Sequence, residues 1–199
     1  PATSIITLHI PHTGGLRVML KNMRVITGII IILMVFCVLQ LVTGGLFYST
    51  VNNDRLNFQR SGVLNAQQEN LSDSVNTLVK TRVTVTRVAI RYLKNQRSPA
   101  DINGLISAAT ASLASAEKSF TAYQALPKLD GQDKNLAAKM ENDYRQMHDV
   151  LKDSIQYLQN GNYEAYGNLE AQKAQDDMEA TFIQWRAENN RFLQEAADQ

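Results

Sequence analysis

Three arginines lie within one short stretch of the chain, "VKTRVTVTRVAIRY" from Val79 to Tyr92. Arg82, Arg87 and Arg91 are separated by five and four residues. A guanidinium group binds a carboxylate through two parallel hydrogen bonds, so clustered arginines are a candidate site for a small organic acid. From residue 74 to residue 100 the sequence has no acidic residue that could pair with them locally. The alternative is that the arginines are solvated or pair with acids of neighbouring helices.

The secondary structure of this stretch decides where the arginines point. Its Val, Thr and Ile content favours a strand locally. Over a longer window, however, a seam of apolar positions repeats at four and three residues, at Leu71, Val75, Leu78, Arg82, Val85, Ala89 and Tyr92. Such a heptad pattern is typical of a helix, and packing commonly overrides local propensity. We therefore predict a helix.

The spacing of the arginines on that helix points to two copies of the chain. At about 100° per residue, Arg87 and Arg91 share a face, whereas Arg82 lies about 140° from Arg87 and about 180° from Arg91. One helix cannot aim all three at one point, but two adjacent copies can. The spacing thus indicates a homodimer with sites at the subunit boundary. Because Arg82 falls on the apolar seam, its charge needs an anion.

An uncharged stretch, "VITGIIIILMVFCVLQLVTGGLFY", occupies residues 25–48. As a helix it is about 36 Å long, enough to cross a hydrocarbon core of about 30 Å. A buried core helix is the alternative, although such helices seldom run so long without a polar face. Residues 1–24 carry Arg17, Lys21 and Arg24 and no acid, so the positive-inside rule predicts that they are cytoplasmic and that residues 49–199 lie outside.

The ends of the chain raise a separate question. "MLKNMRVI" from Met19 looks like a natural start, and we regard residues 1–18 as extraneous to the protein. The chain stops within a polar helical stretch at Gln199. We therefore expect it to be truncated before a second transmembrane helix.

Residues 49–199 are expected to form helices throughout. The clearest breaks are Pro99, Pro127 and Gly161, and each segment between them has helical periodicity. Ser98 is expected to cap the second helix. We predict an all-α fold, an antiparallel up-down four-helix bundle whose first helix continues the transmembrane helix.

Composition excludes several classes of function. A net charge of +1 does not favour nucleic-acid binding. The single cysteine, Cys37, excludes an internal disulfide, and three scattered histidines, His9, His12 and His148, do not form a metal motif. No nucleophile–base set, paired carboxylates or phosphate loop is evident, so we expect neither an enzyme nor a cofactor.

Two segments resemble a known family. "MLKNMRVITGIIIILMVFCVLQLVTGGLFY" and "LVKTRVTVTRVAIRY" are similar to the enterobacterial methyl-accepting chemotaxis receptors for serine and aspartate. The resemblance implies a homodimeric, periplasmic four-helix sensory domain at the bacterial inner membrane, with the ligand at the dimer interface. Cytoplasmic signalling proteins would be reached only through a C-terminal part that this chain lacks.

The resemblance also implies roles for individual residues. The three arginines would bind the carboxylates of the ligand, and Thr86 matches a position where relatives carry Ser or Asn in contact with it. Tyr166 matches an aromatic position on the fourth helix. Gln172 is retained where relatives carry "QPTQG" and this chain has "LEAQK".

The same segment departs from the family pattern. Ala171 replaces the threonine that holds the ligand ammonium, and Glu170 replaces the proline. Glu170 could anchor an amine instead, or repel a di- or tricarboxylate. A carboxylate ligand is expected, but an amino acid and an organic acid both stay open. The other functions considered are the outer bundle of a sensor histidine kinase and a membrane-anchored structural coiled coil.

Overall fold

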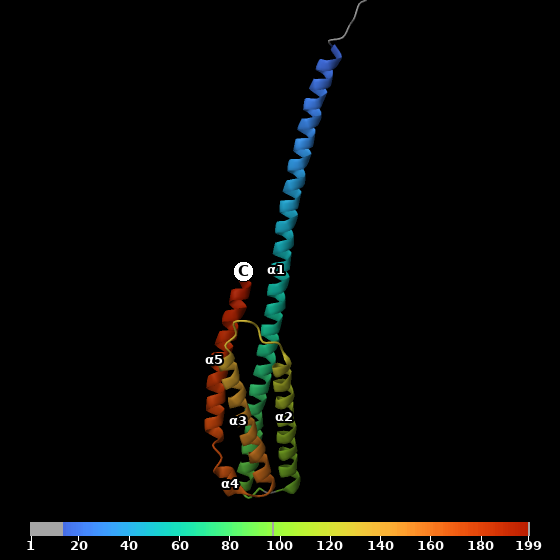
Figure 1. Cartoon of the computed structure of the whole chain (residues 1–199). Helices are drawn as coiled ribbons and strands as arrows, with labels where there is room; N and C mark the ends of the chain where they lie inside the picture. Colours follow the sequence, from blue (N-terminus) through green and yellow to red (C-terminus); the bar gives the residue numbers. More distant parts are fainter. Residues whose placement is uncertain (1–13, 97, 199) are drawn as a thin grey trace, which may run out of the picture. The chain divides into compact units, whose positions relative to one another are not determined.

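The computed structural model describes residues 14–96 and 98–198. Every regular element among them is a helix: α1 (Gly14–Leu93), α2 (Pro99–Ala125), α3 (Lys134–Gln159), α4 (Tyr163–Gly167) and α5 (Ala171–Ala197), as drawn in Figure 1. The prediction of an all-α fold is confirmed for these residues. Residues 1–13, most of the stretch that we regard as extraneous, lie outside the described part.

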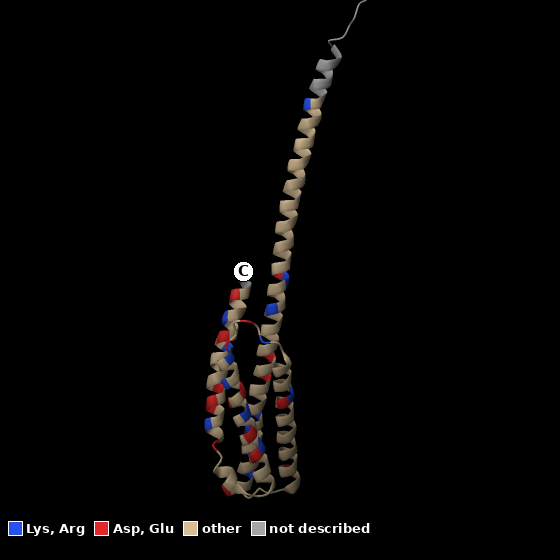
Figure 2. Ribbon diagram, viewed as in Figure 1, with Lys and Arg blue, Asp and Glu red and all other residues tan. Residues whose placement is uncertain are grey.

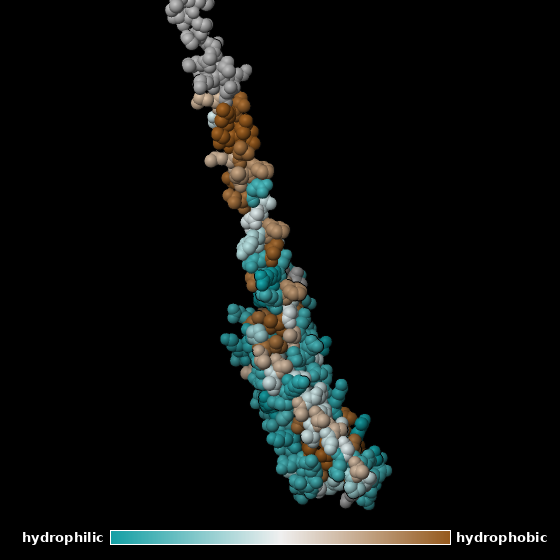
Figure 3. Space-filling view, turned by 90° about the vertical axis from the view of Figure 1, so that its right-hand side faces the viewer, coloured by the Kyte–Doolittle hydropathy of each residue, from teal (hydrophilic) through white to brown (hydrophobic). Residues whose placement is uncertain are grey.

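The chain divides into two compact units, residues 1–54 and 55–199, and α1 contributes to both. In the first unit, residues 25–53 carry no charge and form an unbroken tan stretch in Figure 2. Much of this stretch is brown in Figure 3, because large apolar side chains are exposed along it. Within the described residues, α1 is the one helix long and apolar enough to cross a membrane. The boundaries of the span and the cytoplasmic placement of residues 1–24 stay predictions.

The arginine stretch, residues 79–92, lies entirely within α1, so the helical interpretation is confirmed. The heptad seam also faces the core as predicted. Five of its seven positions are buried, and Arg82 and Tyr92 are half-buried; the buried ones are Leu71, Val75, Leu78, Val85 and Ala89. Periodicity over several turns therefore outweighed the local preference of Val and Thr for strands.

The second unit is a bundle of four long helices: α1 from residue 55, α2, α3 and α5. In Figure 1 the α1–α2 turn and α4 lie at one end of this bundle, and the α2–α3 loop (126–133) lies at the other. α5 packs chiefly on α3. Aromatic side chains fill the core: Phe120 stacks on Tyr144 with ring centroids 3.8 Å apart, and Trp185 meets Tyr123 edge-on at 5.8 Å.

Two details differ from the sequence predictions. Ser98 does precede the first residue of α2, but its side chain makes no capping hydrogen bond, so the predicted cap is wrong. The fourth helix is also not continuous. α3 ends at Gln159, a left-handed Gly161 (φ +69°) follows, and the one-turn helix α4 then precedes α5. Asn162 caps α4 by accepting a 3.1 Å hydrogen bond from the Ala165 backbone N–H. Tyr166 consequently lies on α4, not on the long fourth helix.

Candidate ligand-binding site

Arg82 joins α1 to the first turns of α5. Its Nη1 donates a 2.9 Å hydrogen bond to Gln172 Oε1 and a 2.7 Å hydrogen bond to Gln175 Oε1. The two glutamines are three residues apart and therefore share one face of α5. Both acceptors are neutral amides, so the half-buried guanidinium has no carboxylate in direct contact among the described residues.

The glutamines connect this cation indirectly to two acids. Gln172 Nε2 donates to Asp176 Oδ1 at 2.8 Å, and Gln175 Nε2 donates to Glu179 Oε1 at 3.2 Å. Each amide thus accepts from Arg82 and donates to a carboxylate one turn further along α5. Such relays fix the orientation of the amides. Nε and Nη2 of Arg82 donate to none of the described residues, which leaves one edge of the guanidinium open to a bidentate acceptor.

Two hollows meet at Arg82. The first, the Tyr166 cavity, has a volume of about 220 Å³, and its lining residues are Arg82, Val85, Leu151, Ser154, Tyr166, Gly167, Leu169, Ala171 and Gln172. The second, the Arg87 groove, has a volume of about 320 Å³, and its lining residues are Val79, Arg82, Val83, Thr86, Arg87, Ile90 and Gln175. The Tyr166 cavity reaches the start of α5, whereas the Arg87 groove runs along the outer face of α1.

Arg87 and Thr86 lie in the Arg87 groove. Arg87 is exposed and makes no hydrogen bond or ion pair with the residues that the structure describes. Thr86 donates its hydroxyl to the Arg82 backbone carbonyl at 2.9 Å, a bond within α1 that leaves the oxygen at the surface. Val83 and Ile90 expose apolar side chains beside them. The groove therefore offers an uncompensated cation on an apolar surface.

Arg91 has a different environment. Its Nη1 lies 3.1 Å from Asp101 Oδ2 on α2 and 3.5 Å from Gln96 Oε1. Both members of the ion pair are partly exposed. Arg91 therefore pairs with an acid of a neighbouring helix, which is the alternative interpretation given for the arginines in the sequence analysis. A ligand would compete with Asp101 for it.

Within one chain, Arg82, Tyr166 and Gln172 are brought together, and Arg87 and Thr86 line an adjoining hollow. Arg91 contacts neither hollow. This grouping differs from the angular prediction, because Arg82 and Arg87 line one groove, whereas Arg91, which was predicted to share a face with Arg87, lines neither hollow. Sequence reasoning missed Gln175, although its spacing from Gln172 places it on the same helical face and could have identified it.

The segment that departs from the family pattern begins α5. Glu170 is the residue before the helix, and its side chain makes no capping hydrogen bond. Ala171 lines the Tyr166 cavity with a methyl group only. Lys173 points to Asp177, with which it forms an ion pair of 2.5 Å. The hydroxyl groups of the cavity lining come instead from Ser154 and Tyr166, which lie outside this segment.

Comparison with known proteins places these features in a family context. Residues 19–192 match the family described as Tar ligand binding domain homologue. The chain is 52% identical over 183 residues to the methyl-accepting chemotaxis citrate transducer of Salmonella typhimurium, covering 90% of this chain and 34% of that protein. It is 34% identical over 177 residues to methyl-accepting chemotaxis protein I of Escherichia coli, with coverages of 87% and 32%.

A third relative is the methyl-accepting chemotaxis aspartate transducer of Klebsiella aerogenes, which is 32% identical over 171 residues, with coverages of 84% and 31%. The chain therefore spans about a third of the length of the curated relatives that it matches.

Proposed function

This chain belongs to the Tar ligand-binding domain family, and we propose that it is the carboxylate-sensing part of a transmembrane chemotaxis receptor. The family is one of ligand-binding domains, and the chain is a sensor domain rather than an enzyme. Its ligand would be recognised by Arg82, Arg87 and Arg91, with Thr86, Tyr166 and Gln172 around it.

One observation carries this proposal. Arg82 keeps its Nε and Nη2 without acceptors among the described residues, and its only acceptors are two neutral amides. A half-buried guanidinium without a directly bound carboxylate is stabilised when an anion joins it. A carboxylate satisfies both free nitrogens at once, because its two oxygens match the spacing of the guanidinium edge.

The ligand class follows from the chemistry of the hollow. The Ala171 side chain offers no oxygen to hold an ammonium group, so an amine lacks the acceptor that the resemblance assigns to a threonine at this position. Three guanidinium groups can bind more than one carboxylate. The 52% identical relative is named as a citrate transducer. We therefore favour a polycarboxylic acid such as citrate over serine or aspartate.

Two copies of the chain would complete the site at a bacterial inner membrane. Arg82 of one subunit would face Arg87 and Arg91 of the other, as the angular spacing predicts. The apolar first part of α1 would anchor the domain, and the bundle would lie in the periplasm. Occupancy would bias two arrangements of the dimer, for which coupling free energies of about 1–3 kcal/mol are typical.

The ligand class can be tested by calorimetric titration of the full chain in lipid nanodiscs with citrate, aspartate and serine. We expect saturable binding of citrate and binding of the two amino acids that is weaker by about tenfold or more. Aspartate or serine binding as tightly as citrate would overturn the ligand class. Absence of binding by all three would overturn the carboxylate sensor itself.

The shared site can be tested by mixing subunits. Arg82→Ala and Arg87→Ala each remove one arginine from both sites of a homodimer. In a dimer of one chain of each kind, one site loses both arginines and the other keeps both. In mixed dimers purified through two affinity tags, citrate binding should therefore be restored at one of the two sites if each site draws on two subunits. Failure to restore binding, with mixed dimers verified by two affinity tags, would contradict a shared site.

A further inference from the structure

The first turns of α5 repeat one arrangement, a glutamine followed four residues later by an acid. Gln172 Nε2 donates to Asp176 Oδ1 at 2.8 Å, and Gln175 Nε2 donates to Glu179 Oε1 at 3.2 Å. Residues four apart on a helix are neighbours on its surface. Among the described residues, neither acid makes another hydrogen bond or an ion pair. The two carboxylates therefore act on the amides alone.

The two amides together occupy one nitrogen of Arg82. Nη1 carries two hydrogens, and it donates to Gln172 Oε1 at 2.9 Å and to Gln175 Oε1 at 2.7 Å. A guanidinium group is planar and rigid, so fixing both hydrogens of Nη1 also fixes the plane of the group. The direction in which the Nε–Nη2 edge faces thus depends on the positions of these two amide oxygens.

The acids determine which end of each amide faces the arginine. A glutamine amide carries an acceptor oxygen on one side and a donor nitrogen on the other. Were the Gln175 amide reversed, its Nε2 would face Arg82 Nη1, two donors would meet, and the hydrogen bond would be lost. The Glu179 carboxylate only accepts, so it binds Nε2 and leaves Oε1 towards Arg82. Asp176 does the same for Gln172.

The acids lie behind the amides and outside the hollows. Gln175 lines the Arg87 groove, Gln172 lines the Tyr166 cavity, and Arg82 lines both. Neither Asp176 nor Glu179 lines either hollow. A carboxylate bound directly to Arg82 would compete with an anionic ligand for the guanidinium hydrogens. A neutral amide between the acid and the cation orients the cation without neutralising it.

We propose that Glu179 and Asp176 are positioning residues of the ligand site, which aim the free edge of Arg82 through Gln175 and Gln172. The effect on ligand affinity rests on the proposed function, whereas the orientation of Arg82 is a property of the chain without ligand. Glu179 carries the larger share, because Gln175 is half-buried and makes the shorter bond to Arg82, whereas Gln172 is exposed.

Four variants separate orientation from charge. Glu179→Gln keeps an acceptor without the charge, and Glu179→Leu removes the acceptor. Glu179→Lys replaces the acceptor by a donor, which would draw Gln175 Oε1 away from Arg82. Asp177→Lys is the matched control, because it makes the same charge change two residues away, at a carboxylate that pairs with Lys173 and contacts neither amide.

The first measurement is calorimetric titration of the full chain in lipid nanodiscs with citrate. We expect an affinity within about twofold of the unsubstituted chain for Glu179→Gln, about threefold weaker for Glu179→Leu and about tenfold weaker for Glu179→Lys. Long-range attraction of the anion predicts the opposite order, because each change makes the region more positive. Asp177→Lys should therefore bind citrate equally or more tightly. Tighter binding by Glu179→Lys would overturn the inference.

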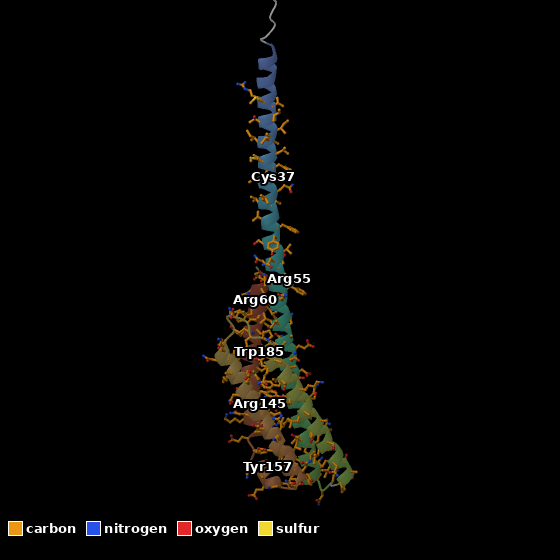
Figure 4. The ribbon with its side chains drawn as sticks, turned by 45° about the vertical axis from the view of Figure 1, so that its right-hand side comes forward. Cys37, Arg55, Arg60, Arg145, Tyr157 and Trp185 are labelled. Carbon is orange, nitrogen blue, oxygen red and sulfur yellow. The ribbon has the colours of Figure 1, made fainter. Side chains whose placement is uncertain are left out.

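The second measurement needs no ligand. Trp185, the only tryptophan in the sequence, lies within the bundle (Figure 4), so its fluorescence follows unfolding in polymer-bounded lipid particles that contain no indole. Arg82→Ala and Glu179→Leu should together lower the melting temperature by about 2 °C less than the sum of their separate effects. With Gln175→Leu also present, the two effects should add. Additive effects in the unsubstituted background overturn the inference.

The outcomes separate this inference from the proposed function. Non-additive melting temperatures without citrate binding by any chain would overturn the proposed function and support the orientation of Arg82 by Glu179. Citrate binding that is equal in the unsubstituted chain and in Glu179→Lys would overturn the positioning role alone. Should Glu179→Lys fail to fold, the comparison of Glu179→Leu with Glu179→Gln decides, and equal citrate affinity of these two variants contradicts the role.

Discussion

Arg82 on α1 donates a 2.9 Å hydrogen bond to Gln172 in the first turn of α5, so the two helices are joined at this point by a cation and a neutral amide. An amide oxygen binds a guanidinium less strongly than a carboxylate does. Because the bond uses Nη1 alone, a ligand carboxylate can add to it at the opposite edge without displacing Gln172. Gln172 thereby holds the guanidinium with its Nε–Nη2 edge free of acceptors among the described residues.

Arg87→Ala should weaken ligand binding without destabilising the bundle. Arg87 is exposed and unpaired with the described residues, so the free energy of unfolding should change by less than about 0.5 kcal/mol. Citrate affinity should fall by about tenfold to a hundredfold, the usual loss for a hydrogen bond to a charged group. Calorimetry and thermal denaturation measure the two quantities. Lys80→Ala, an exposed cation on the same helix outside both hollows, is the control and should bind citrate normally.

Asp101→Asn should tighten citrate binding. Asp101 and Arg91 form a partly exposed ion pair at 3.1 Å, and a ligand carboxylate must compete with it. Exposed pairs contribute about 0.2–1 kcal/mol, so releasing Arg91 should raise affinity up to about fivefold. A calorimetric titration of the variant with citrate measures this affinity. An affinity weaker than that of the unsubstituted chain would show that Arg91 does not reach the ligand.

Ala171→Thr should shift selectivity towards amino acids. Ala171 lines the Tyr166 cavity beside Gln172, and a hydroxyl there provides an acceptor for an ammonium group. We expect aspartate affinity to rise by about tenfold relative to citrate. Ala171→Val, which has the same shape without the hydroxyl, should not reproduce the gain. If both variants raise the affinity for aspartate equally, the gain comes from the larger side-chain volume and not from the hydroxyl.

Thr181→Val should destabilise the bundle through a buried acid. Asp143 on α3 is 7% exposed, and its Oδ2 accepts a 2.6 Å hydrogen bond from the fully buried Thr181 hydroxyl on α5. Valine keeps the shape but leaves the carboxylate without this donor, which should cost about 1–3 kcal/mol of unfolding free energy. Denaturation followed by circular dichroism measures the loss. Thr181→Ser retains the hydroxyl and should be clearly more stable than Thr181→Val.

The stability of the bundle should fall at alkaline pH through Tyr144. Burial first, and the negative charge of Glu117 second, raise the pKa of this phenol above its ordinary value of 10.0. The unfolded chain therefore ionises at a lower pH than the folded chain. The contribution to stability is complete below pH 10.0 and is lost as the pH rises from there towards the folded pKa.

Tyr144→Phe isolates this effect. The melting temperature of the unsubstituted chain should fall more steeply above pH 10.0 than that of the variant, which has no phenol to ionise at this position. Parallel melting curves across the alkaline range would contradict a raised pKa of Tyr144.

Much of the bundle could be predicted from the sequence. The heptad seam could be identified because an apolar residue recurs at every turn, as at Leu71, Val75 and Leu78, and several matches to one period give a stronger signal than a single residue. The resemblance to chemotaxis receptors was carried by unbroken motifs, and the family match over residues 19–192 confirms it. Local propensity alone would have assigned residues 79–92 to a strand.

Other details depend on contacts between distant segments. The pairing of Arg91 with Asp101 arises from the path of the chain between α1 and α2, which no local pattern specifies. α4 is one turn long, too short to have its own periodicity. Asn189 has the sequence pattern of an ordinary polar residue on a surface helix, and its burial follows only from the packing of α1 against α5. The homodimer, the orientation in the membrane and the shared site stay predictions.

The α2–α3 loop (126–133) is held to α1 by Gln67 and Gln132, two side chains that carry no charge at any pH at which the protein folds. Their hydrogen bonds are neither titrated by protons nor screened by dissolved ions. The α2–α3 loop would therefore keep these two amide contacts through changes of pH and salt concentration for as long as the bundle stays folded.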